Sequence, residues 1–323
     1  MCTAVSFKSK DHYFGRNLDL DFHYNETVTI TPQNYPFVFR CLNTIPTHYA
    51  IIGMATVDQN YPLYYDATNE YGLSMAGLNF PGEAVYQGHK QDFDNVAPFE
   101  LIPWVLAQCK TVKEAKDLLI KTNLCNQPYN ADYPLSPLHW MVADKAESIV
   151  VEPLAEGLKI HENPIGILAN CPPFEYHLNN LRNYLNLTAD MPQNRFADKL
   201  QLTPYSRGMG AIGLPGDLSS ASRFVRAAFV KFNSICDDDE SSAVSQFFHI
   251  LSSVEQQNGC CKTERGYEKT IYSSCCNTDK GIYYFVTYDH RQIRAVNLHS
   301  VPLESQELQS YRIDQTQKFE YIN

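Results

Sequence analysis

The chain begins with the sequence MCTAVSFKSKDHYFGRNLD, residues 1–19. The apolar run of residues 3–7, the polar residues 8–11 and a second apolar run at residues 12–14 predict two strands joined by a turn. Such a hairpin brings Arg16 and Asp19 back beside Cys2. We therefore expect the first two strands to be antiparallel neighbours, with Cys2 at their open end.

Cys2 becomes the N-terminal residue once Met1 is removed, which a small second residue generally permits, and then carries both a thiol and a free α-amine. A thiol has a pKa of about 8.5 and an α-amine one of about 7.7–8.0, so the amine is a usable proton acceptor near neutral pH. The Arg16 guanidinium would favour the thiolate, and the Asp19 carboxylate can orient the amine. These residues predict an activated nucleophile. The alternative is an ordinary cysteine near a surface ion pair of Arg16 and Asp19.

Seven stretches of the sequence resemble the choloylglycine hydrolase family, which contains bile salt hydrolases and penicillin V acylases. They are MCT at 1–3, FGRNLD at 14–19, GLSMAGLNFPG at 72–82, LHWM at 138–141, IGILAN at 165–170, GLPGD at 213–217 and ASRF at 221–224. The matches run in order over nearly the whole chain. The resemblance implies an α+β fold, the four-layer αββα sandwich of N-terminal nucleophile hydrolases.

Composition is consistent with one soluble domain spanning residues 1–323. Hydrophobic residues make up 44% of the chain, and no low-complexity linker divides it. A mean hydropathy of −0.33 and the lack of eighteen consecutive apolar residues exclude a membrane span. The start lacks the pattern of a signal peptide, which predicts the cytoplasm. A net charge of −10 without a basic stripe argues against a nucleic-acid partner.

The ten cysteines do not have the spacing of a metal site or a disulfide framework. Disulfide-dense chains are short and secreted, and the adjacent pairs Cys260-Cys261 and Cys275-Cys276 lack the C-x2-C spacing of a tetrahedral metal site. We expect neither a metal nor a cofactor. A metal or redox role for these pairs is the alternative.

The rest of the sequence predicts strands, then helices, then a mixed region and a final group of strands. Strands are expected at residues 27–30, 37–39, 50–57, 61–65, 71–78, 138–142, 148–151, 165–169, 270–275, 281–287 and 292–298. Helices are expected at 99–109 with a bend at Pro103, at 112–120 after a capping box at 111–114, at 174–187, from Arg223 after a cap at Ser219 or Ser220, and around 244–254.

Three helices carry apolar stripes that should face the core. Their residues are Leu178, Leu181 and Leu185 in the first, Phe224, Ala228 and Phe232 in the second, and Val244, Phe247, Phe248, Leu251 and Val254 in the third. The polar stretch 190–216 between the first two shows no periodicity. The family's corresponding excursion reaches a neighbouring subunit, so the resemblance implies a tetramer assembly loop and a homotetramer.

The resemblance also implies which residues form the catalytic site. They are Cys2, Arg16, Asp19, Asn79, Asn170 and Arg223. The Asn79 amide can donate to a developing oxyanion, and Gly77 permits close approach of the backbone. On the residues alone, Asn79 and Asn170 could equally be turn residues at strand ends, and Arg223 a surface arginine in the first turn of a helix.

Four residues are implied by analogy to bind the substrate, namely Leu18, Tyr65, Tyr129 and Tyr133. Apolar and aromatic side chains suit a steroid body, although a chain with 21 tyrosines places tyrosine on many surfaces. Bile salt hydrolases generally carry asparagine where Asn79 stands, and penicillin V acylases often carry tyrosine. The resemblance therefore implies conjugated bile salts of glycine or taurine as substrates. The alternatives are a penicillin V or acyl-homoserine-lactone acylase and, in another class, a thiol-rich binding or redox protein.

Overall fold

The computed structural model describes all residues from Met1 to Asn323, and two large antiparallel sheets form its centre. The first sheet has the order β12 (Ile167–Leu168), β1 (Cys2–Lys8), β2 (His12–Leu20), β14 (Tyr267–Asn277), β15 (Ile282–Thr287) and β16 (His290–Asn297), with β13 (Cys261–Lys262) paired to β14. The second has the order β11 (Gly157–Glu162), β10 (Ser148–Leu154), β9 (Leu138–Ala143), β6 (Ser74–Asn79), β5 (Tyr61–Asn69), β4 (Ile51–Asp58), β3 (Thr27–Thr31) and β17 (Gln309–Arg312).

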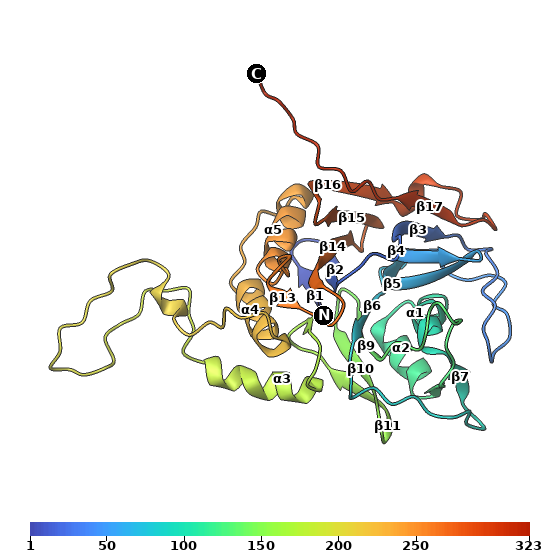
Figure 1. Cartoon of the computed structure of the whole chain (residues 1–323), viewed down its shortest axis with the longest axis horizontal. Helices are drawn as coiled ribbons and strands as arrows, with labels where there is room; N and C mark the ends of the chain where they lie inside the picture. The colour runs from blue at the N-terminus through green and yellow to red at the C-terminus, as the bar shows by residue number, and fades with distance from the viewer.

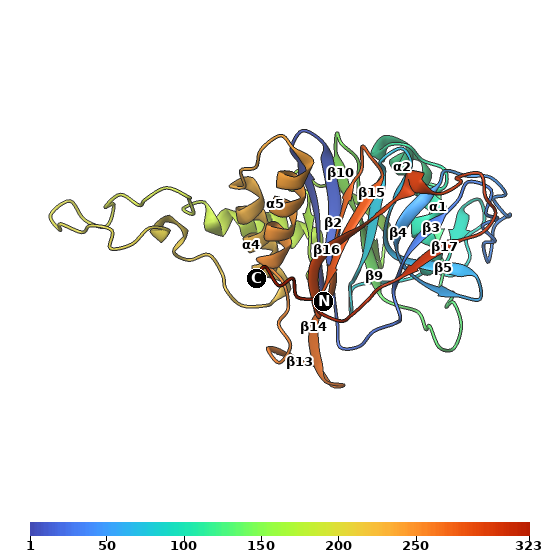
Figure 2. The same ribbon diagram turned by 90° about the horizontal axis from the view of Figure 1, so that it is seen from above.

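Helices cover the outer faces of both sheets, which gives the four layers of the predicted αββα sandwich (Figures 1 and 2). On the first sheet lie α4 (Ser220–Phe232) and α5 (Glu240–Ser252), and on the second α1 (Leu101–Leu106) and α2 (Val112–Leu119). The helix α3 (Phe174–Asn180) packs against α4. Four short 3-10 helices, η1 (Pro98–Glu100), η2 (Leu181–Tyr184), η3 (Met209–Ala211) and η4 (Leu298–Ser300), and a parallel pair, β7 (Asp94–Val96) and β8 (Thr122–Leu124), complete the fold.

The opening hairpin forms as the sequence predicts and lies in the middle of the first sheet. The β1–β2 ladder runs from the pair of Lys8 with His12 to the pair of Cys2 with Leu18. On the other side of β2, a Cβ on Gly15 would lie 1.9 Å from the carbonyl oxygen of Ser274 in β14. Only glycine allows the two strands to come so close. The hairpin is thus fixed on both sides, and Cys2 is held at a defined point at its end.

Residues 37–39 are not a strand, which makes that prediction wrong. Phe37 forms only an isolated bridge with Ile45. The preceding Pro36 has no N–H to give to a ladder, and the rings of Phe37 and Phe39 are buried among the aromatic residues of the second core. Their aromatic character therefore reflects burial of the side chains and not strand pairing.

The predicted helices are present, but most are shorter than expected. The helix expected at 99–109 consists of η1 and α1, and the one expected at 174–187 consists of α3 and η2. Thr111 caps α2 by accepting a hydrogen bond from the Glu114 nitrogen at 3.2 Å, while Glu114 accepts from the Lys110 nitrogen. Ser219 stands at the N-cap of α4, yet its hydroxyl bonds to the Ser222 hydroxyl instead of capping the helix.

Two residues of the predicted apolar stripes lie in solvent. Leu185, past the end of η2, is 85% exposed, and Phe232, the last residue of α4, is 61% exposed. The Phe232 ring packs against the ammonium group of Lys231 at 5.1 Å instead of the core. The stripe of α5 is confirmed, because Val244, Phe247, Phe248 and Leu251 are buried together with Val254 just beyond the helix.

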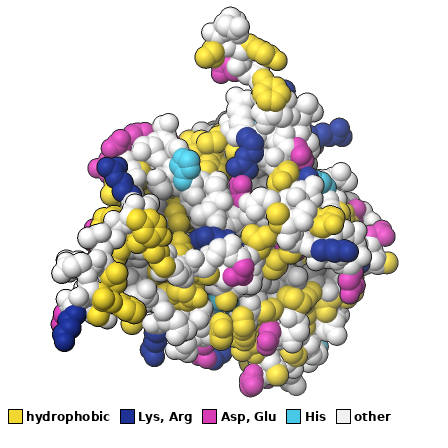
Figure 3. Space-filling model, turned by 60° about the vertical axis from the view of Figure 1, so that its left-hand side comes forward, with side chains coloured by type: hydrophobic (Ala, Val, Ile, Leu, Met, Phe, Trp, Pro, Cys, Tyr) yellow, Lys and Arg dark blue, Asp and Glu magenta, His cyan; other side chains and the backbone are white.

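The segment from residue 188 to residue 218 extends away from the sandwich as a long excursion with only η3 as regular structure (Figures 1 and 2). It includes the predicted loop 190–216. Several of its apolar side chains are exposed, among them Phe196, Tyr205 and Ile212. Figure 3 looks at the side of the molecule that carries this segment and shows hydrophobic side chains gathered at the surface. None of the helices has the length and apolar character that crossing a membrane requires.

Candidate active site

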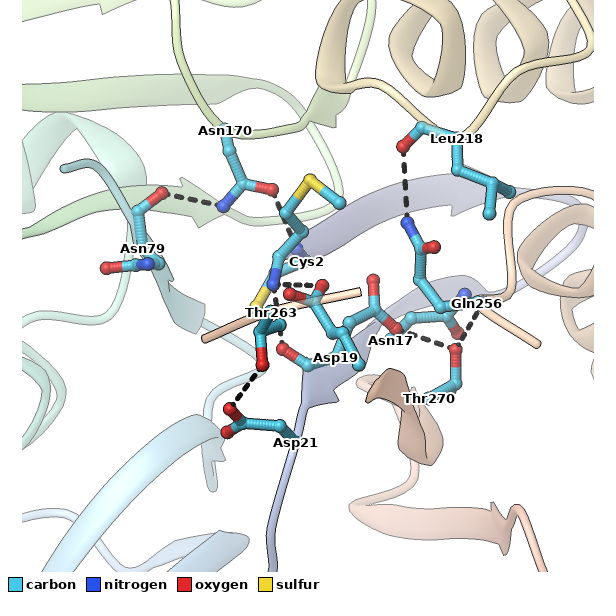
Figure 4. A network of polar contacts seen from close by, with 12 residues as sticks. Cys2, Asn17, Asp19, Asp21, Asn79, Asn170, Leu218, Gln256, Thr263 and Thr270 are labelled. Carbon is cyan, nitrogen blue, oxygen red and sulfur yellow. Dashed lines mark hydrogen bonds and ion pairs between the residues drawn. The ribbon is translucent and has the colours of Figure 1, made fainter. Parts of the chain in front are cut away.

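Cys2 lies at the point where the hairpin, the second sheet and α4 meet (Figure 4). It is the first residue of β1 and is 2% exposed. Asn79 ends β6 of the second sheet, Asn170 follows β12 after two residues, and Arg223 lies in the first turn of α4. The fold therefore brings together residues from four separate parts of the sequence.

The Asn170 side chain connects these parts. Its Oδ1 accepts hydrogen bonds from the Cys2 main-chain nitrogen and from Nη2 of Arg223, both at 2.7 Å. Its Nδ2 donates to the carbonyl oxygen of Asn79 at 2.6 Å (Figure 4). The side chain thus reaches three other elements, so the interpretation of Asn170 as a simple turn residue is wrong.

Arg223 is fully buried and holds the start of β1. Its Nη1 donates to the Cys2 carbonyl oxygen and to Oγ1 of Thr3, both at 2.5 Å, and its Nε donates to the Leu218 carbonyl oxygen at 3.1 Å. The alternative of a surface arginine at a helix start is therefore wrong. With Asn170, Arg223 fixes the main chain on both sides of the Cys2 α-carbon.

Arg16 is also fully buried and lies in β2, two residues before Leu18, which pairs with Cys2. Its Nη1 donates to the Tyr65 carbonyl oxygen at 3.1 Å and to that of Gly77, while Nη2 has no hydrogen-bond partner. Burial works against its charge, but the negative groups around it, chief among them Cys2, raise the pKa of the guanidinium above its usual value. Arg16 therefore places a permanent positive charge close to Cys2.

Asp19 has no surface exposure either, so the surface ion pair considered from the sequence does not exist. Its Oδ1 accepts from the Thr270 hydroxyl at 2.6 Å, and its Oδ2 has no partner. Burial raises the pKa of this carboxyl, although the nearby terminal ammonium and Arg223 oppose the effect. Oδ2 of Asp19 and Nη2 of Arg16 are thus two buried polar atoms without a hydrogen-bond partner, and both are available to bind a reacting group.

The terminal amine in this structure belongs to Met1, and its partners include one that the sequence did not indicate. The ammonium donates to the Asp19 carbonyl oxygen at 2.8 Å and forms an ion pair with the Glu268 carboxylate. Glu268 lies in β14, 267 positions from Met1, in a stretch without any recognisable motif. Only the pairing of β14 with β2 places it at the chain start.

A mostly apolar cavity of about 180 Å³ has Gly77 in its wall. Tyr65, Tyr129 and Tyr133 line it, as do Tyr24, Leu63, Phe99, Leu135, Leu138 and Trp140. Because the carbonyl groups of Tyr65 and Gly77 both accept from Arg16, the cavity wall is tied directly to the site around Cys2. Leu18 does not line this cavity, since it pairs with Cys2 and is buried in the core between the sheets.

The cysteines are all free thiols, and the two adjacent pairs differ in their surroundings. Cys275 and Cys276 are buried in β14, whereas Cys260 is exposed and Cys261 partly exposed. Burial raises the pKa of both Cys275 and Cys276, the latter to about 12. These two buried thiols are therefore poor nucleophiles.

Comparisons with known proteins agree with this geometry. The sequence profile described as linear amide C-N hydrolases, choloylglycine hydrolase family, matches residues 2–311. A bile salt hydrolase/transferase of Lactiplantibacillus plantarum is 55% identical over 324 residues, with 100% of both chains covered. One from Clostridium perfringens is 37% identical over 336 residues, again with 100% of both covered.

Solved structures show the same relationship. The crystal structure of a variant of the conjugated bile acid hydrolase from Clostridium perfringens covers 100% of both chains with a TM-score of 0.93 and 35% identity. Penicillin V acylase from Agrobacterium tumefaciens covers 96% of this chain and 90% of its own, with a TM-score of 0.75 and 17% identity, and so shares the fold. With its buried Cys2 at the chain start and this αββα sandwich, the chain belongs to the choloylglycine hydrolase family of linear amide C–N hydrolases, which have the N-terminal nucleophile hydrolase fold.

Proposed function

We propose that the protein hydrolyses the amide bond of glycine- and taurine-conjugated bile salts, with Cys2 as nucleophile after removal of Met1. The observation that carries this proposal is the position of Cys2. Its main-chain nitrogen is held by Asn170, the charge of Arg16 lies close by, and the aromatic cavity is lined by two residues, Tyr65 and Gly77, whose carbonyl groups Arg16 binds. An amide with a bulky apolar acyl group fits this combination of a thiolate and an apolar cavity.

The reaction follows from the chemistry of the N-terminal cysteine. The thiol proton passes to the free α-amine of Cys2 as Sγ attacks the carbonyl carbon, forming the C–S bond. Arg16 stabilises the thiolate, and Asn170 orients the amine through the contact that its Oδ1 makes with the Cys2 nitrogen. The oxyanion of the tetrahedral intermediate accepts hydrogen bonds from the Asn79 amide and a backbone N–H.

The intermediate then collapses in the direction of the products. The α-ammonium gives its proton to the leaving nitrogen as the C–N bond breaks, which releases glycine or taurine and leaves a thioester on Cys2. Water attacks this thioester with the α-amine again as base and releases the bile acid. In this scheme the Asp19 carboxylate orients the amine, and Arg223 holds Asn170 and the Cys2 carbonyl in place.

The cavity supports the choice of acyl group. Its lining combines tyrosine rings, which present apolar faces, with hydroxyl groups at their edges, and a steroid body with scattered hydroxyls has matching chemistry. The names of the relatives at 55% and 37% identity refer to bile salts. Asparagine at position 79 also favours the bile salt branch over the penicillin V branch.

The test is the release of free glycine from a glycine-conjugated bile salt by the purified protein, with intact mass showing that Met1 is absent. Taurine-conjugated bile salt and penicillin V are assayed in parallel. We expect release of glycine, taurine or both at rates at least tenfold above that with penicillin V, and at least about 10³-fold less in Cys2→Ser, whose hydroxyl a near-neutral amine activates poorly. Preferential cleavage of penicillin V, or Cys2→Ser within tenfold of the wild type, would overturn the proposal.

We also propose that the protein is a homotetramer in which residues 190–216 are buried against neighbouring subunits. Phe196 and Tyr205, both more than four fifths exposed in the single chain, support this assembly, because apolar side chains gathered on an extended segment gain free energy by burial. Light scattering at micromolar concentration should give about four times the chain mass of 36.8 kDa. A monomer would refute the assembly without touching the proposed reaction.

A further inference from the structure

A buried carboxylate, Glu152 of β10, is linked through neighbouring side chains to the main chain around Asn170. It has no solvent exposure. Its Oε1 lies 3.3 Å from Nδ1 of His139 and accepts a hydrogen bond from the main-chain nitrogen of Phe174 at 2.9 Å. Burial alone would disfavour its charge, but the hydrogen bond with His139 and further contacts lower the pKa of Glu152 to about 2. Glu152 is therefore a buried carboxylate in contact with both His139 and the start of α3.

The first of these contacts leads to the residue before Asn170. His139, in β9, stacks flat on Phe80 with the ring centres 4.2 Å apart, and its Nε2 donates to the Ala169 carbonyl oxygen at 2.8 Å. Both ring nitrogens thus face oxygen acceptors, one on Glu152 and one on Ala169. The ring bridges the carboxylate and the main chain immediately before Asn170.

The second contact leads to the carbonyl group of Asn170 itself. Phe174 is the first residue of α3, so the bond to Glu152 fixes where this helix begins. One turn later His177, stacked on Phe224, donates from Nε2 to the Asn170 carbonyl oxygen at 2.8 Å. The Asn170 nitrogen donates to the Ser220 hydroxyl at 2.8 Å, so both main-chain groups of the residue are held.

We propose that Glu152, His139 and His177 are positioning residues for the reaction: one buried carboxylate oxygen fixes the main chain before and after Asn170, so that the Asn170 side chain meets the Cys2 amine. None of the three touches the reacting atoms. A side chain that must orient an amine loses efficiency when its backbone shifts by a fraction of an ångström, because the geometry of proton transfer is then lost. The proposal rests on the function proposed above.

The experiment compares His139→Phe with a matched control, His161→Phe. Phenylalanine keeps the ring that stacks on Phe80 and removes both ring nitrogens. His161 also contacts Glu152, with Nε2 3.2 Å from Oε2, but the carbonyl oxygens of Ala169 and Asn170 are bound by His139 and His177 and not by His161. Each purified variant is checked for fold by circular dichroism and thermal unfolding. Release of glycine then gives kcat and KM, and alkylation of Cys2 by iodoacetamide, followed by mass spectrometry, gives a readout independent of substrate.

We expect His139→Phe to lower kcat at least tenfold with KM within threefold of the wild type and to change the alkylation rate of Cys2 at least threefold. His161→Phe should stay within twofold on all three measures, and His139→Gln, which restores a donor, should recover much of the lost kcat. The loss should recur in His177→Phe, which keeps the stacking on Phe224. If His139→Phe does not fold, the proposal is tested with His177→Phe and the isosteric Glu152→Gln. Each of these two variants should lower kcat at least threefold.

The proposal is overturned if the folded His139→Phe or His177→Phe keeps kcat within twofold of the wild type, or if only KM changes in these variants. It is also overturned if His161→Phe lowers kcat as much as His139→Phe does. Failure of the wild type to release glycine or taurine would overturn the proposed function instead. The alkylation rates then decide on positioning by themselves, with unchanged rates in His139→Phe and His177→Phe counting against it.

Discussion

Gly77 in β6 and Trp140 in β9 lie directly opposite each other in the second sheet, and the indole occupies the space where a side chain of residue 77 would be. A Cβ on Gly77 would be 3.0 Å from Nε1 of Trp140 and 3.2 Å from its Cδ1. Both residues line the aromatic cavity, and the Gly77 carbonyl accepts from Arg16. The absence of a side chain at Gly77 therefore leaves room for the Trp140 indole in the cavity wall.

Gly77→Ala should accordingly weaken binding of the acyl group more than it slows the chemical step. The methyl group forces the indole to move by a few tenths of an ångström and fills part of the cavity. We expect KM for a glycine-conjugated bile salt to rise about three- to tenfold with kcat within about threefold, because binding is lost equally in the ground state and the transition state. Gly88→Ala, where a Cβ meets no atom within 4 Å, is the control. An unchanged KM, or the same rise in the control, would contradict the argument.

Retention of Met1 should abolish turnover. With Met1 in place, the Cys2 nitrogen is a peptide N–H that donates to Asn170, and its lone pair is delocalised into the amide carbonyl, so it cannot take the thiol proton. The amine is displaced to Met1, where Glu268 and the Asp19 carbonyl bind it. A preparation with an uncleavable N-terminal extension should lose at least about 10²-fold in kcat while binding the substrate with similar affinity. Full turnover in a sample whose intact mass includes Met1 would exclude the amine as base.

A third prediction concerns stability at acid pH and His12, at the closed end of the opening hairpin. The ring is buried, with Nδ1 2.9 Å from the Thr278 hydroxyl and Nε2 2.8 Å from that of Ser6. Burial lowers the pKa of His12 from 6.5 to about 4. Below pH 6.5 the unfolded chain therefore binds a proton that the folded protein does not, so stability is lost as the pH falls from 6.5 to about 4.

The difference between these pKa values corresponds to about 3 kcal/mol of unfolding free energy. His12→Gln keeps polar atoms at this position and removes the titration, so its unfolding free energy should fall less between pH 7 and pH 4.5. Urea unfolding at both pH values, with the exposed His89→Gln as control, measures the effect. The same pH dependence in the wild type and His12→Gln would show that the acid sensitivity arises elsewhere.

Local patterns predicted the parts of the fold whose contacts are close in sequence. The two apolar runs at residues 3–7 and 12–14, with polar residues between them, predict the β1–β2 hairpin. The helical spacing of Phe247, Leu251 and their neighbours predicts the buried face of α5. The pattern at residues 37–39 misled because burial of aromatic rings and strand pairing favour the same residue types. The predicted helices extend too far for a similar reason. Leu185 continues the helical spacing of apolar residues, but its side chain is exposed and has nothing to pack against.

The site itself is mostly long-range, and this limits what a sequence can reveal about it. Asn170 was placed correctly near a strand end, but its contact with Cys2, 168 positions away, depends on how β12 pairs with β1. Glu268 and Glu152 carry no motif at all, and they reach the site only through the registers of β14 and β10. His139 lay in a stretch that resembles the family, yet nothing in that stretch distinguished a positioning side chain from a core residue.

The last prediction tests whether Asn79 sets the choice of acyl group. Asn79 contacts Asn170 through its main-chain carbonyl, so Asn79→Tyr keeps that hydrogen bond and changes only what the side chain presents to the substrate. A phenol removes the amide as oxyanion donor and adds a bulky ring near the acyl group, which narrows the space for a wide steroid. We expect kcat/KM for conjugated bile salts to fall at least about tenfold, roughly 1.4 kcal/mol of transition-state stabilisation, with a smaller loss for penicillin V and other phenoxyacetyl amides. The ratio of the two losses is the measurement, since a damaged fold lowers both alike. Equal losses, or none on bile salts, would mean that specificity is set elsewhere in the cavity, with the tyrosines that line it as the next residues to change.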